Sequence, residues 1–253
     1  MSTQKIALVT GGSRGLGRNM AIALANNGLN VILTYNSNKD EAQKVVSEIE
    51  SMGKTATALQ LNVAKSDTFA SFFDEVSSVL KAKFGTDKFD YLINNAGTGS
   101  YTPFAETTEE QFTEMFDIHL KSAYFLTQKS LGLLNDGGGI VNISSGLARF
   151  SFPGSSAYAA MKGGVEVMTR YIAKELGGRK IRANVVAPGP IETDFGGGRV
   201  RDTKELNDQL SNMTALGRVG LPDDIGGVVA FLCSDASKWV NAQRIEVSGG
   251  LLI

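Results

Sequence analysis

Cysteine is almost missing from this chain, since Cys233 is the only one among 253 residues. A single thiol excludes an internal disulfide and also a zinc site built from four cysteines. Cys233 ends the apolar run of residues 227–233, where a thiol packs as a small hydrophobic group. We therefore expect Cys233 to be a buried structural thiol.

An excess of charge and long hydrophobic runs are missing as well. The net charge is −1 with both signs interspersed, which gives no indication of a nucleic-acid partner or an anionic membrane surface. No stretch reaches about 18 apolar residues, and residues 1–10 lack the apolar run and cleavage site of a signal peptide. We therefore expect a cytoplasmic protein with no nucleic-acid and no membrane partner.

Hydrophobic residues and glycines are plentiful, at 42% of the chain and 29 residues respectively. Short apolar runs alternate with amphipathic segments of helix length, and several of the runs are apolar throughout, as in a parallel sheet covered on both faces. The expected strands are residues 5–10, 30–35, 55–61, 91–94, 139–144, 181–187 and 244–249. The expected helices are residues 16–28, 39–53, 66–85, 107–134 and 157–178. This pattern predicts the α/β class with a Rossmann-type, doubly wound parallel sheet of about seven strands, in a single domain over residues 1–253.

The one long irregular region follows the sixth expected strand, from Pro188 to Pro222. It contains three consecutive glycines, Gly196 to Gly198, and a segment from about Thr203 to Met213 that could form a short helix. Long loops after the carboxyl end of a strand often cover the ligand crevice. We expect a substrate lid at approximately residues 189–221; an oligomer contact or a merely mobile loop is the alternative.

A glycine-rich turn, Thr10 to Gly17, leads from the first expected strand into the first helix. Its G-x-x-x-G-x-G spacing lets the backbone turn sharply and approach a pyrophosphate at the helix N-terminus, although it could also be only a tight turn. NAD-binding sheets usually carry a carboxylate after the second strand, but here the first acidic residue is Asp40. With Arg14 and Lys39 available, we expect NADP rather than NAD, unless both cations are ordinary solvated charges.

Tyr158 and Lys162 lie four residues apart, and Ser145 lies thirteen residues before the tyrosine. On a helix, the i,i+4 pair faces one side, where the ammonium is expected to stabilise the phenolate and lower the pKa of Tyr158. Such a phenol can serve as a general acid or base, while the serine hydroxyl bonds a substrate oxygen as charge develops there. The Y-x-x-x-K pattern alone is weak, so the rest of the chain must support it.

The motifs together resemble the short-chain dehydrogenase/reductase family over nearly the whole chain, and most closely its 3-oxoacyl-carrier-protein reductase-like branch. The motifs are TGGSRGLG at residues 10–17, NNAG at 94–97, ISS at 143–145, YAAMK at 158–162, PGPIETD at 188–194 and RVGLPDDIGGVVAFLCS at 218–234. The resemblance implies a hydride transfer between a nicotinamide and a carbonyl or secondary alcohol, without a metal. It also implies a homotetramer or homodimer.

The resemblance assigns roles residue by residue. Tyr158 would be the proton donor or acceptor, Lys162 would bond the nicotinamide ribose, and Ser145 would hold the substrate carbonyl. The implied cofactor-binding residues are Gly11, Ser13, Arg14, Gly15, Leu16, Gly17, Asn36, Lys39, Asn62, Val63, Asn94, Ala96, Gly97, Tyr158, Lys162, Pro188, Gly189, Ile191 and Thr193.

Three positions depart from the family pattern. His119, the only histidine, stands where members usually have an asparagine that helps to bind a water of the proton relay. An imidazole could hold that water and itself titrate near neutral pH, although a lone histidine is often a buried structural residue. Asn62 replaces an aspartate that often contacts the adenine, and Ala242 with Ser248 replace a commoner glycine and aspartate.

Two other functions remain open at this point. A non-catalytic NADP-binding sensor or structural subunit could keep the glycine turn, but it would not need Ser145, Tyr158 and Lys162. An NAD-dependent alcohol dehydrogenase of the same family would differ only in its cofactor. Dehydratases and epimerases of this fold usually carry a further C-terminal substrate domain, for which this chain has no room.

Overall fold

The computed structural model describes residues 5–253, and a seven-stranded sheet lies at its centre. All neighbouring strands are parallel, in the order β3-β2-β1-β4-β5-β6-β7. The strands are β1 (Ile6–Val9), β2 (Asn30–Tyr35), β3 (Ala56–Gln60), β4 (Phe89–Asn94), β5 (Leu134–Ile143), β6 (Arg182–Pro188) and β7 (Arg244–Val247). The strand order reverses between β1 and β4, which is where ligands bind in open α/β sheets.

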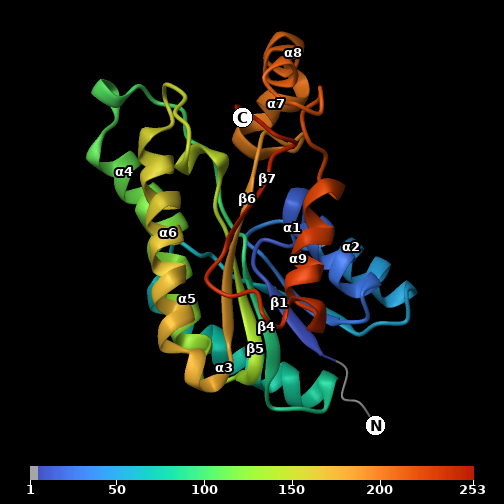
Figure 1. Ribbon diagram of the computed structural model, residues 1–253. Helices are drawn as coiled ribbons and strands as arrows, with labels where there is room; N and C mark the ends of the chain where they lie inside the picture. The colour runs from blue at the N-terminus through green and yellow to red at the C-terminus, as the bar shows by residue number, and fades with distance from the viewer. Residues whose placement is uncertain (1–4) are drawn as a thin grey trace.

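Helices cover both faces of the sheet (Figure 1). One face carries α1 (Gly15–Asn26), α2 (Lys39–Ser51) and α9 (Asp223–Leu232), and the other carries α3 (Phe69–Val79), α5 (Ser122–Ser130) and α6 (Ser156–Glu175). Outside these layers lie α4 (Glu109–Met115), which continues into α5, and the short helices α7 (Arg199–Asp202) and α8 (Lys204–Asn212). The predicted doubly wound fold is confirmed.

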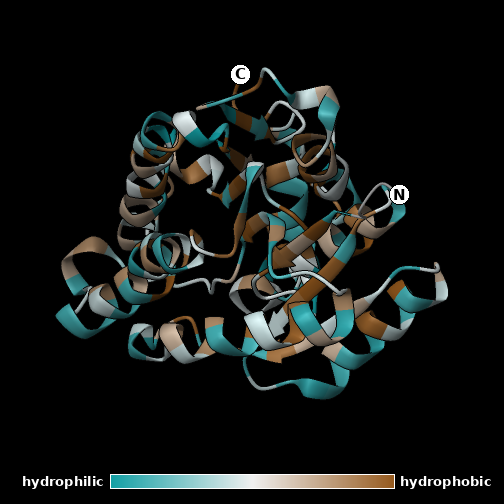
Figure 2. Cartoon of the chain, turned by 90° about the horizontal axis from the view of Figure 1, so that it is seen from below, coloured by the Kyte–Doolittle hydropathy of each residue, from teal (hydrophilic) through white to brown (hydrophobic). Residues whose placement is uncertain are grey.

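Two hydrophobic cores hold the layers together, one on each face of the sheet. Met20, Leu24 and Ile49 are buried in the first core, and Phe69 and Leu126 in the second. In Figure 2 the strands are mostly hydrophobic and the surrounding helices carry most of the hydrophilic residues. This distribution explains why the expected strands read as nearly continuous apolar runs.

The helix expected over residues 107–134 is not regular. It begins at a Thr108–Gln111 capping box, and a π-helical segment, Phe116–Lys121, separates α4 from α5. The helix ends at Ser130, because Leu134 already belongs to β5. Hydrophobic spacing cannot distinguish a regular α-helix from one with a π-helical turn, since a single wider turn shifts the helical face only locally. The irregular turn carries His119.

Helix α9 is missing from the sequence prediction, which assigned only a buried cysteine to that region. Two acidic residues at the start, Asp223 and Asp224, are typical of a helix N-terminus, but Gly226 and Gly227 lower the helical propensity. A Cβ on Gly226 would overlap Asn19 of α1, so this glycine allows α1 and α9 to pack closely. Cys233 at the end of α9 is buried, as expected, and burial raises the pKa of its thiol to about 12.

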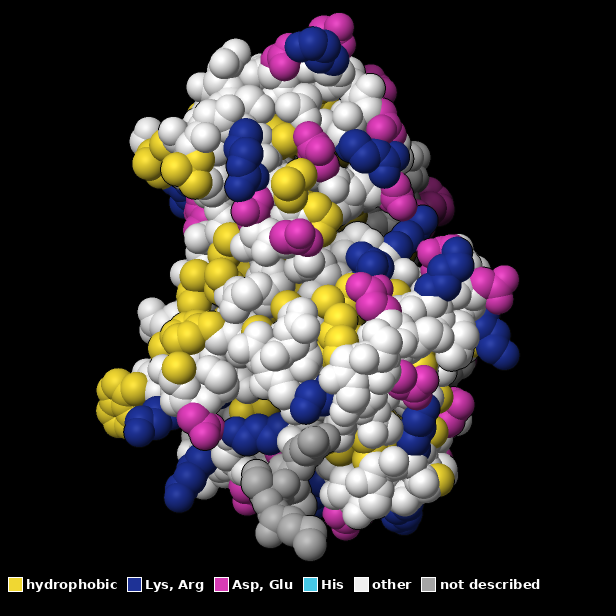
Figure 3. Space-filling model, turned by 90° about the vertical axis from the view of Figure 1, so that its right-hand side faces the viewer, with side chains coloured by type: hydrophobic (Ala, Val, Ile, Leu, Met, Phe, Trp, Pro, Cys, Tyr) yellow, Lys and Arg dark blue, Asp and Glu magenta, His cyan; other side chains and the backbone are white. Residues whose placement is uncertain are grey.

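The surface carries charges of both signs. On the face at the right-hand side of Figure 1, Lys and Arg side chains alternate with Asp and Glu side chains (Figure 3). In residues 5–253 no helix has the length and apolar character needed to cross a bilayer.

Candidate active site

The glycine-rich turn between β1 and α1 is held in shape by the backbone. Gly11 has a φ of +65°, and a Cβ on Gly17 would overlap the carbonyl oxygen of Gly11. The side chain of Asn95 donates hydrogen bonds to the carbonyl oxygens of Thr10 at 2.8 Å and Gly11 at 3.2 Å. The turn therefore presents a preformed, side-chain-free surface at the N-terminus of α1, where the helix dipole favours an anion.

A cleft of about 1360 Å³ runs from this turn to the segment after β5. Most residues expected to bind a cofactor line it. They are Gly11, Ser13, Arg14, Gly15, Leu16, Gly17, Asn36, Asn62, Val63, Ala96, Gly97, Tyr158, Lys162, Pro188, Gly189, Ile191 and Thr193. A nicotinamide dinucleotide fits this cradle, because bare backbone at one end would face its phosphates and polar side chains at the other would face its reactive ring.

Two of the expected cofactor residues do not line the cleft. Lys39 begins α2 and is exposed outside it. Asn94 lies behind the cleft, where its side-chain amide donates to Thr127 at 3.0 Å and to Asn142 at 2.8 Å. The following residue, Asn95, lines the cleft instead. Residue order within the NNAG motif did not reveal which asparagine faces the ligand, because successive side chains at a strand end point to opposite sides.

The end of β2 contributes no carboxylate to the cleft. Its lining residues there are Thr34, Tyr35, Asn36, Ser37 and Asn38. Arg14 of the glycine turn lines the same cleft, with its side chain 70% exposed and one guanidinium nitrogen 4.0 Å from Asp194. This end of the cleft can therefore accept an additional phosphate, which a carboxylate would repel.

Ser145, Tyr158 and Lys162 meet at the opposite end. Ser145 follows β5, while Tyr158 and Lys162 lie one turn apart on α6 with the ammonium 5.5 Å from the centre of the phenol ring. Ser145 accepts a hydrogen bond from the backbone amide of Leu147 at 3.2 Å, and its hydroxyl lies near enough to the phenol of Tyr158 to favour the phenolate. The Lys162 ammonium donates to the carbonyl oxygen of Ile143 at 2.7 Å. The three side chains thus lie together on the cleft wall.

Burial changes the proton affinities of this group. It raises the pKa of Tyr158, against the smaller lowering effect of the Ser145 hydrogen bond, and it lowers the pKa of Lys162 to about 8. The expectation that Lys162 lowers the pKa of Tyr158 is therefore wrong for the structure described here, because removal from water disfavours the phenolate more. A protonated phenol is the form that donates a proton to a carbonyl oxygen.

His119 lies directly behind Tyr158, and the two rings meet edge to face with centroids 4.9 Å apart. Nε2 of His119 donates to the carbonyl oxygen of Thr98 at 2.8 Å, which leaves Nδ1 as an acceptor. Burial, and then the charge of Lys162, lower the pKa of His119 to about 3. Titration near neutral pH, which the sequence suggested, is therefore wrong; the imidazole is neutral.

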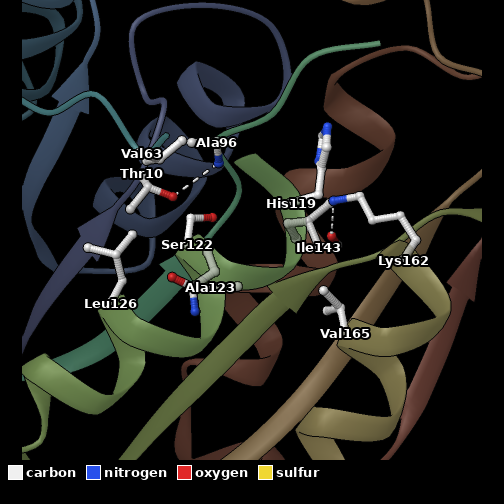
Figure 4. Close-up of a pocket in the computed structure, with 11 residues that line it drawn as sticks. Thr10, Val63, Ala96, His119, Ser122, Ala123, Leu126, Ile143, Lys162 and Val165 are labelled. Carbon is white, nitrogen blue, oxygen red and sulfur yellow. Dashed lines mark hydrogen bonds between the residues drawn. The ribbon is translucent and has the colours of Figure 1, made fainter. Parts of the chain in front are cut away.

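A small cavity of about 10 Å³ lies between His119 and Lys162 (Figure 4). Among the described residues, the only buried side-chain polar atoms without a hydrogen-bond partner are Nδ1 of His119 and Oδ1 of Asn94, and both residues line this cavity. The cavity is about the size of one water molecule, and two acceptors with an ammonium are the polar partners that a buried water needs.

Aromatic side chains form much of the wall above Tyr158. The ring of Phe195 lies 5.7 Å from that of Tyr158, Phe150 and Phe152 pack edge to face, and Tyr101 is covered by the guanidinium of Arg199 at 4.4 Å. Phe195 and Arg199 fall within the lid expected at residues 189–221, whereas Tyr101, Phe150 and Phe152 were not predicted. They come from loops without regular periodicity, so no pattern marks them.

The region expected to be a lid contains α7 and α8, and the predicted helix over residues 203–213 agrees with α8 to within a residue. Leu206, Gln209 and Leu210 of α8 line the cleft, whereas Met213 and Leu216 do not. Gly196, Gly197 and Gly198 all have positive φ values, between 61° and 77°, so the chain makes a tight turn at the start of the region.

Comparison with known proteins identifies the family to which this chain belongs. The family described as Enoyl-(Acyl carrier protein) reductase matches residues 11–252. The hydroxynaphthalene reductase-like protein Arp2 of Metarhizium brunneum is 37% identical over 97% of this chain and 94% of that protein. The chain belongs to the short-chain dehydrogenase/reductase family. The predicted family and oxidoreductase class are confirmed.

Solved structures of the short-chain dehydrogenase/reductase family agree closely with this one. The reductase LugOII, described as catalysing keto-reduction at C1 during lugdunomycin biosynthesis, has a TM-score of 0.93 and 37% identity over 99% of both chains. The angucycline C-6 ketoreductase LanV with bound NADP has a TM-score of 0.93 and 34% identity over 98% of this chain and 95% of that one.

Proposed function

We propose that this protein is an NADPH-dependent reductase of ketones. The observation that carries the proposal is the shared cleft: Ser145 and Tyr158 lie at one end and the glycine turn at the other. A dinucleotide would be held by the residues that line the cleft, and its reduced ring would supply the hydride near Tyr158. The ketone gains a hydride on carbon and a proton on oxygen, so the product is a secondary alcohol.

The catalytic roles follow from the environment of each group. The reduced cofactor supplies the hydride when it is bound. Tyr158 donates the proton, because its buried phenol is held in the protonated form. Ser145 donates a hydrogen bond to the substrate oxygen and stabilises the negative charge that develops there. Lys162 is fixed beside the phenol by its bond to Ile143 and supplies positive charge as the proton leaves.

We propose NADP rather than NAD because of the residues around the end of β2. Asn36, Ser37 and Asn38 provide hydrogen-bond donors there without a carboxylate, and Arg14 brings the positive charge that pairs with a 2′-phosphate. LanV was solved with bound NADP, and a blue fluorescent protein with a TM-score of 0.88 and 33% identity was solved with NADPH. Lys39 takes no part, since it lies outside the cleft.

The substrate that fits best is a flat aromatic ketone. Tyr101, Phe150, Phe152 and Phe195 provide ring surfaces around the reacting group, and aromatic rings stack favourably on one another. A LanV structure with 35% identity contains rabelomycin with NADP, and Arp2 is named for hydroxynaphthalene reduction. Residues 189–221 form a lid that closes over such a substrate, with Phe195 against its ring.

His119 completes the site by holding water. Neutral Nδ1 accepts a hydrogen bond from a water in the small cavity, and this water in turn accepts one from the Lys162 ammonium. After each turnover, a proton taken up from solvent would pass through this water and Lys162 to the phenolate, which restores the phenol. His119 therefore positions the water and does not itself change charge, because its pKa is far below neutral pH.

The protein assembles as a homodimer or homotetramer in the cytoplasm. The faces of α4, α5 and α6 that point away from the sheet expose large apolar side chains at 38–66% of their surface. These side chains are Phe112, Phe116, Tyr124, Phe125, Val167 and Tyr171, the second being on the π-helical segment. Several exposed large apolar side chains on these helices are typical of an interface between subunits.

The proposal is tested by following the absorbance of NADPH with purified protein and a panel of ketones. The panel contains aromatic polycyclic ketones, quinones, simple alkyl ketones and 3-oxoacyl thioesters, each with NADPH and with NADH. We expect turnover of an aromatic ketone with NADPH at a higher kcat/KM than with NADH. Binding of NADPH without turnover of any member of the panel would contradict the proposed reaction.

A further inference from the structure

Four charged side chains form a continuous network at the edge of the sheet, outside the cleft. Glu246 on β7 accepts two hydrogen bonds from Arg149, at 2.7 and 2.8 Å, and one from Arg244 at 2.8 Å. Arg244 also donates to Glu166 of α6 at 2.7 Å. Ser248, which departs from the usual family residue, adds a bond to Glu246 at 3.0 Å. The two acids and two bases neutralise one another.

This network holds the segment that carries Ser145 on both of its sides. Glu166 accepts a hydrogen bond from the hydroxyl of Ser144 at 2.7 Å, and Arg244 donates a longer one to the carbonyl oxygen of Ser145 at 3.4 Å. Arg149 follows the short helical turn that begins after Ser145. The catalytic serine therefore lies between two points at which its own chain segment is tied to β7 and α6.

The same network reaches the lid through the C-terminal segment. Arg149 donates to the carbonyl oxygen of Leu251 at 3.0 Å, and Leu251 lines the cleft. The neighbouring glycine carbonyls, Gly249 and Gly250, accept backbone bonds from Leu216 at 3.0 Å and Ala215 at 3.2 Å. The end of the lid is thus connected to the serine segment through Arg149 and the C-terminal segment after β7.

Stability of the sheet alone does not explain these charges. The backbone already joins β7 to β6, with Val185 bonded to Gln243 at 2.8 Å and Gly189 to Val247 at 3.0 Å. The side chains of Arg244, Glu246 and Glu166 are 24%, 19% and 15% exposed, so their desolvation is costly. Well-packed apolar residues often replace such pairs without loss of stability. A positioning role accounts for a network that stability does not require.

Although burial opposes it, hydrogen bonds from Arg149, Arg244 and Ser248 lower the pKa of Glu246 to about 2. The carboxylate is therefore ionised at every pH at which the enzyme would be assayed. Its bridge between the two guanidinium groups is permanent in the folded protein.

We propose that Glu246, together with Arg149 and Arg244, is a positioning device that holds the hydroxyl of Ser145 beside Tyr158 and ties the serine segment to the end of the lid. None of the three residues lines the cleft, so each acts through Ser145 and touches neither substrate nor cofactor. This inference rests on the proposed function, because it gives the network its purpose in ketone reduction.

The decisive test is a double-mutant cycle between Glu246→Gln and Ser145→Ala, measured as kcat with NADPH and a ketone that the wild type reduces. A displaced catalytic group costs up to about 10²-fold, so we expect Glu246→Gln to lower kcat by about ten- to a hundredfold. The dissociation constant of NADPH should change by less than about twofold. In the Ser145→Ala background, Glu246→Gln should have no further effect, since the group that it positions is gone.

A control removes a more exposed ion pair elsewhere. Asp136 pairs with Arg179 at 2.7 Å, and neither residue lines the cleft. Asp136→Asn should leave kcat unchanged. If Glu246→Gln fails to fold, Arg149→Lys keeps the charge and loses the forked contact, and it should show the same pattern with a smaller loss.

Three outcomes are distinguishable. Equal losses from Glu246→Gln in the wild-type and Ser145→Ala backgrounds would show a structural effect and overturn the inference. A fully active Glu246→Gln variant would overturn it as well, while the proposed function stands. A wild type that binds NADPH but reduces no ketone would overturn the proposed function and the inference with it.

Discussion

The end of the cleft at the glycine turn, called the phosphate end, is formed mainly by backbone. The end at Ser145, Tyr158 and Lys162, called the carbonyl end, depends on buried side chains. At the phosphate end, Gly11 and Gly17 matter because nothing extends from them, and Arg14 is largely exposed. At the carbonyl end, Tyr158 and Lys162 matter because burial changes their pKa values. Substitutions at the two ends should therefore impair the protein for different reasons. At the phosphate end the cause is added atoms, and at the carbonyl end it is altered charge or hydrogen bonding.

Apart from removal of the Tyr158 hydroxyl itself, the largest effect is expected from Lys162→Met at the carbonyl end. Loss of the positive charge beside the phenol should lower kcat by about 10²- to 10³-fold, while the affinity for NADPH changes far less. In the wild type, the pKa of Lys162 is lowered from 10.5 to about 8, so the unfolded chain binds more protons between these values and stability rises with pH there.

The Lys162→Met variant should lose this rise of the free energy of unfolding with pH. Denaturant unfolding from pH 8 to pH 10 measures it, with kcat measured on the same preparations. A Lys162→Met variant with wild-type turnover would contradict this expectation, because it would show that the buried charge is not needed for catalysis.

Gly17→Ala should have the next largest effect, at the phosphate end. The new Cβ overlaps the carbonyl oxygen of Gly11 and the amide of Asn95, so the turn must open. We expect NADPH affinity to fall by about 10²-fold, consistent with the few kcal/mol of a displaced core contact. Titration of NADPH fluorescence measures this loss. Gly132→Ala is the control, because a Cβ there meets open space, and this variant should bind NADPH normally. Gly28 also has open space, but its positive φ makes it unsuitable.

His119→Asn tests whether the imidazole only positions a water or also titrates. Folded His119 has a pKa of about 3 and an unfolded histidine about 6.5, so acid favours the unfolded wild type between these values. At pH 5 this linkage lowers the free energy of unfolding of the wild type by about 2 kcal/mol, and the variant should not show this decrease. Denaturant unfolding at pH 7 and pH 5 measures the difference, and turnover at pH 7 should persist. Total inactivation would show that the imidazole does more than hold water.

Arg14→Ala should give the smallest effect, because the side chain is mostly exposed. Loss of one charge-assisted contact to a phosphate should reduce the preference for NADPH over NADH by about tenfold, and leave kcat unchanged. The ratio of kcat/KM for the two cofactors measures it. Lys39→Ala is the matched control, since this neighbouring cation lies outside the cleft and should not alter the ratio. A larger effect from Lys39 would reverse the assignment.

Local sequence could predict much of this molecule, because motifs and strands are contiguous. The glycine turn, the strand ends and the pairing of Tyr158 with Lys162 all depend on neighbours in the chain. The pKa of Tyr158 could not be predicted, because it depends on burial by distant segments such as Phe195 and His119. The choice between Asn94 and Asn95 required the actual orientation of a strand end.

The network around Glu246 shows the same limit for residues far apart in the chain. It joins Arg149, Glu166 and Arg244, which belong to three different elements, and no sequence spacing connects them. Helix α9 was missed for another reason, since its glycines serve close packing against α1 and weaken the helical signal.

The most direct test of the central claim compares Tyr158→Phe with the wild type in NADPH-dependent ketone reduction and in NADPH binding. Phenylalanine keeps the ring against His119 and Phe195 and removes only the hydroxyl. The account predicts an unchanged dissociation constant for NADPH and a loss of kcat by about 10²- to 10⁴-fold, the usual contribution of a positioned proton donor. A variant that reduces the ketone at the wild-type rate would contradict it.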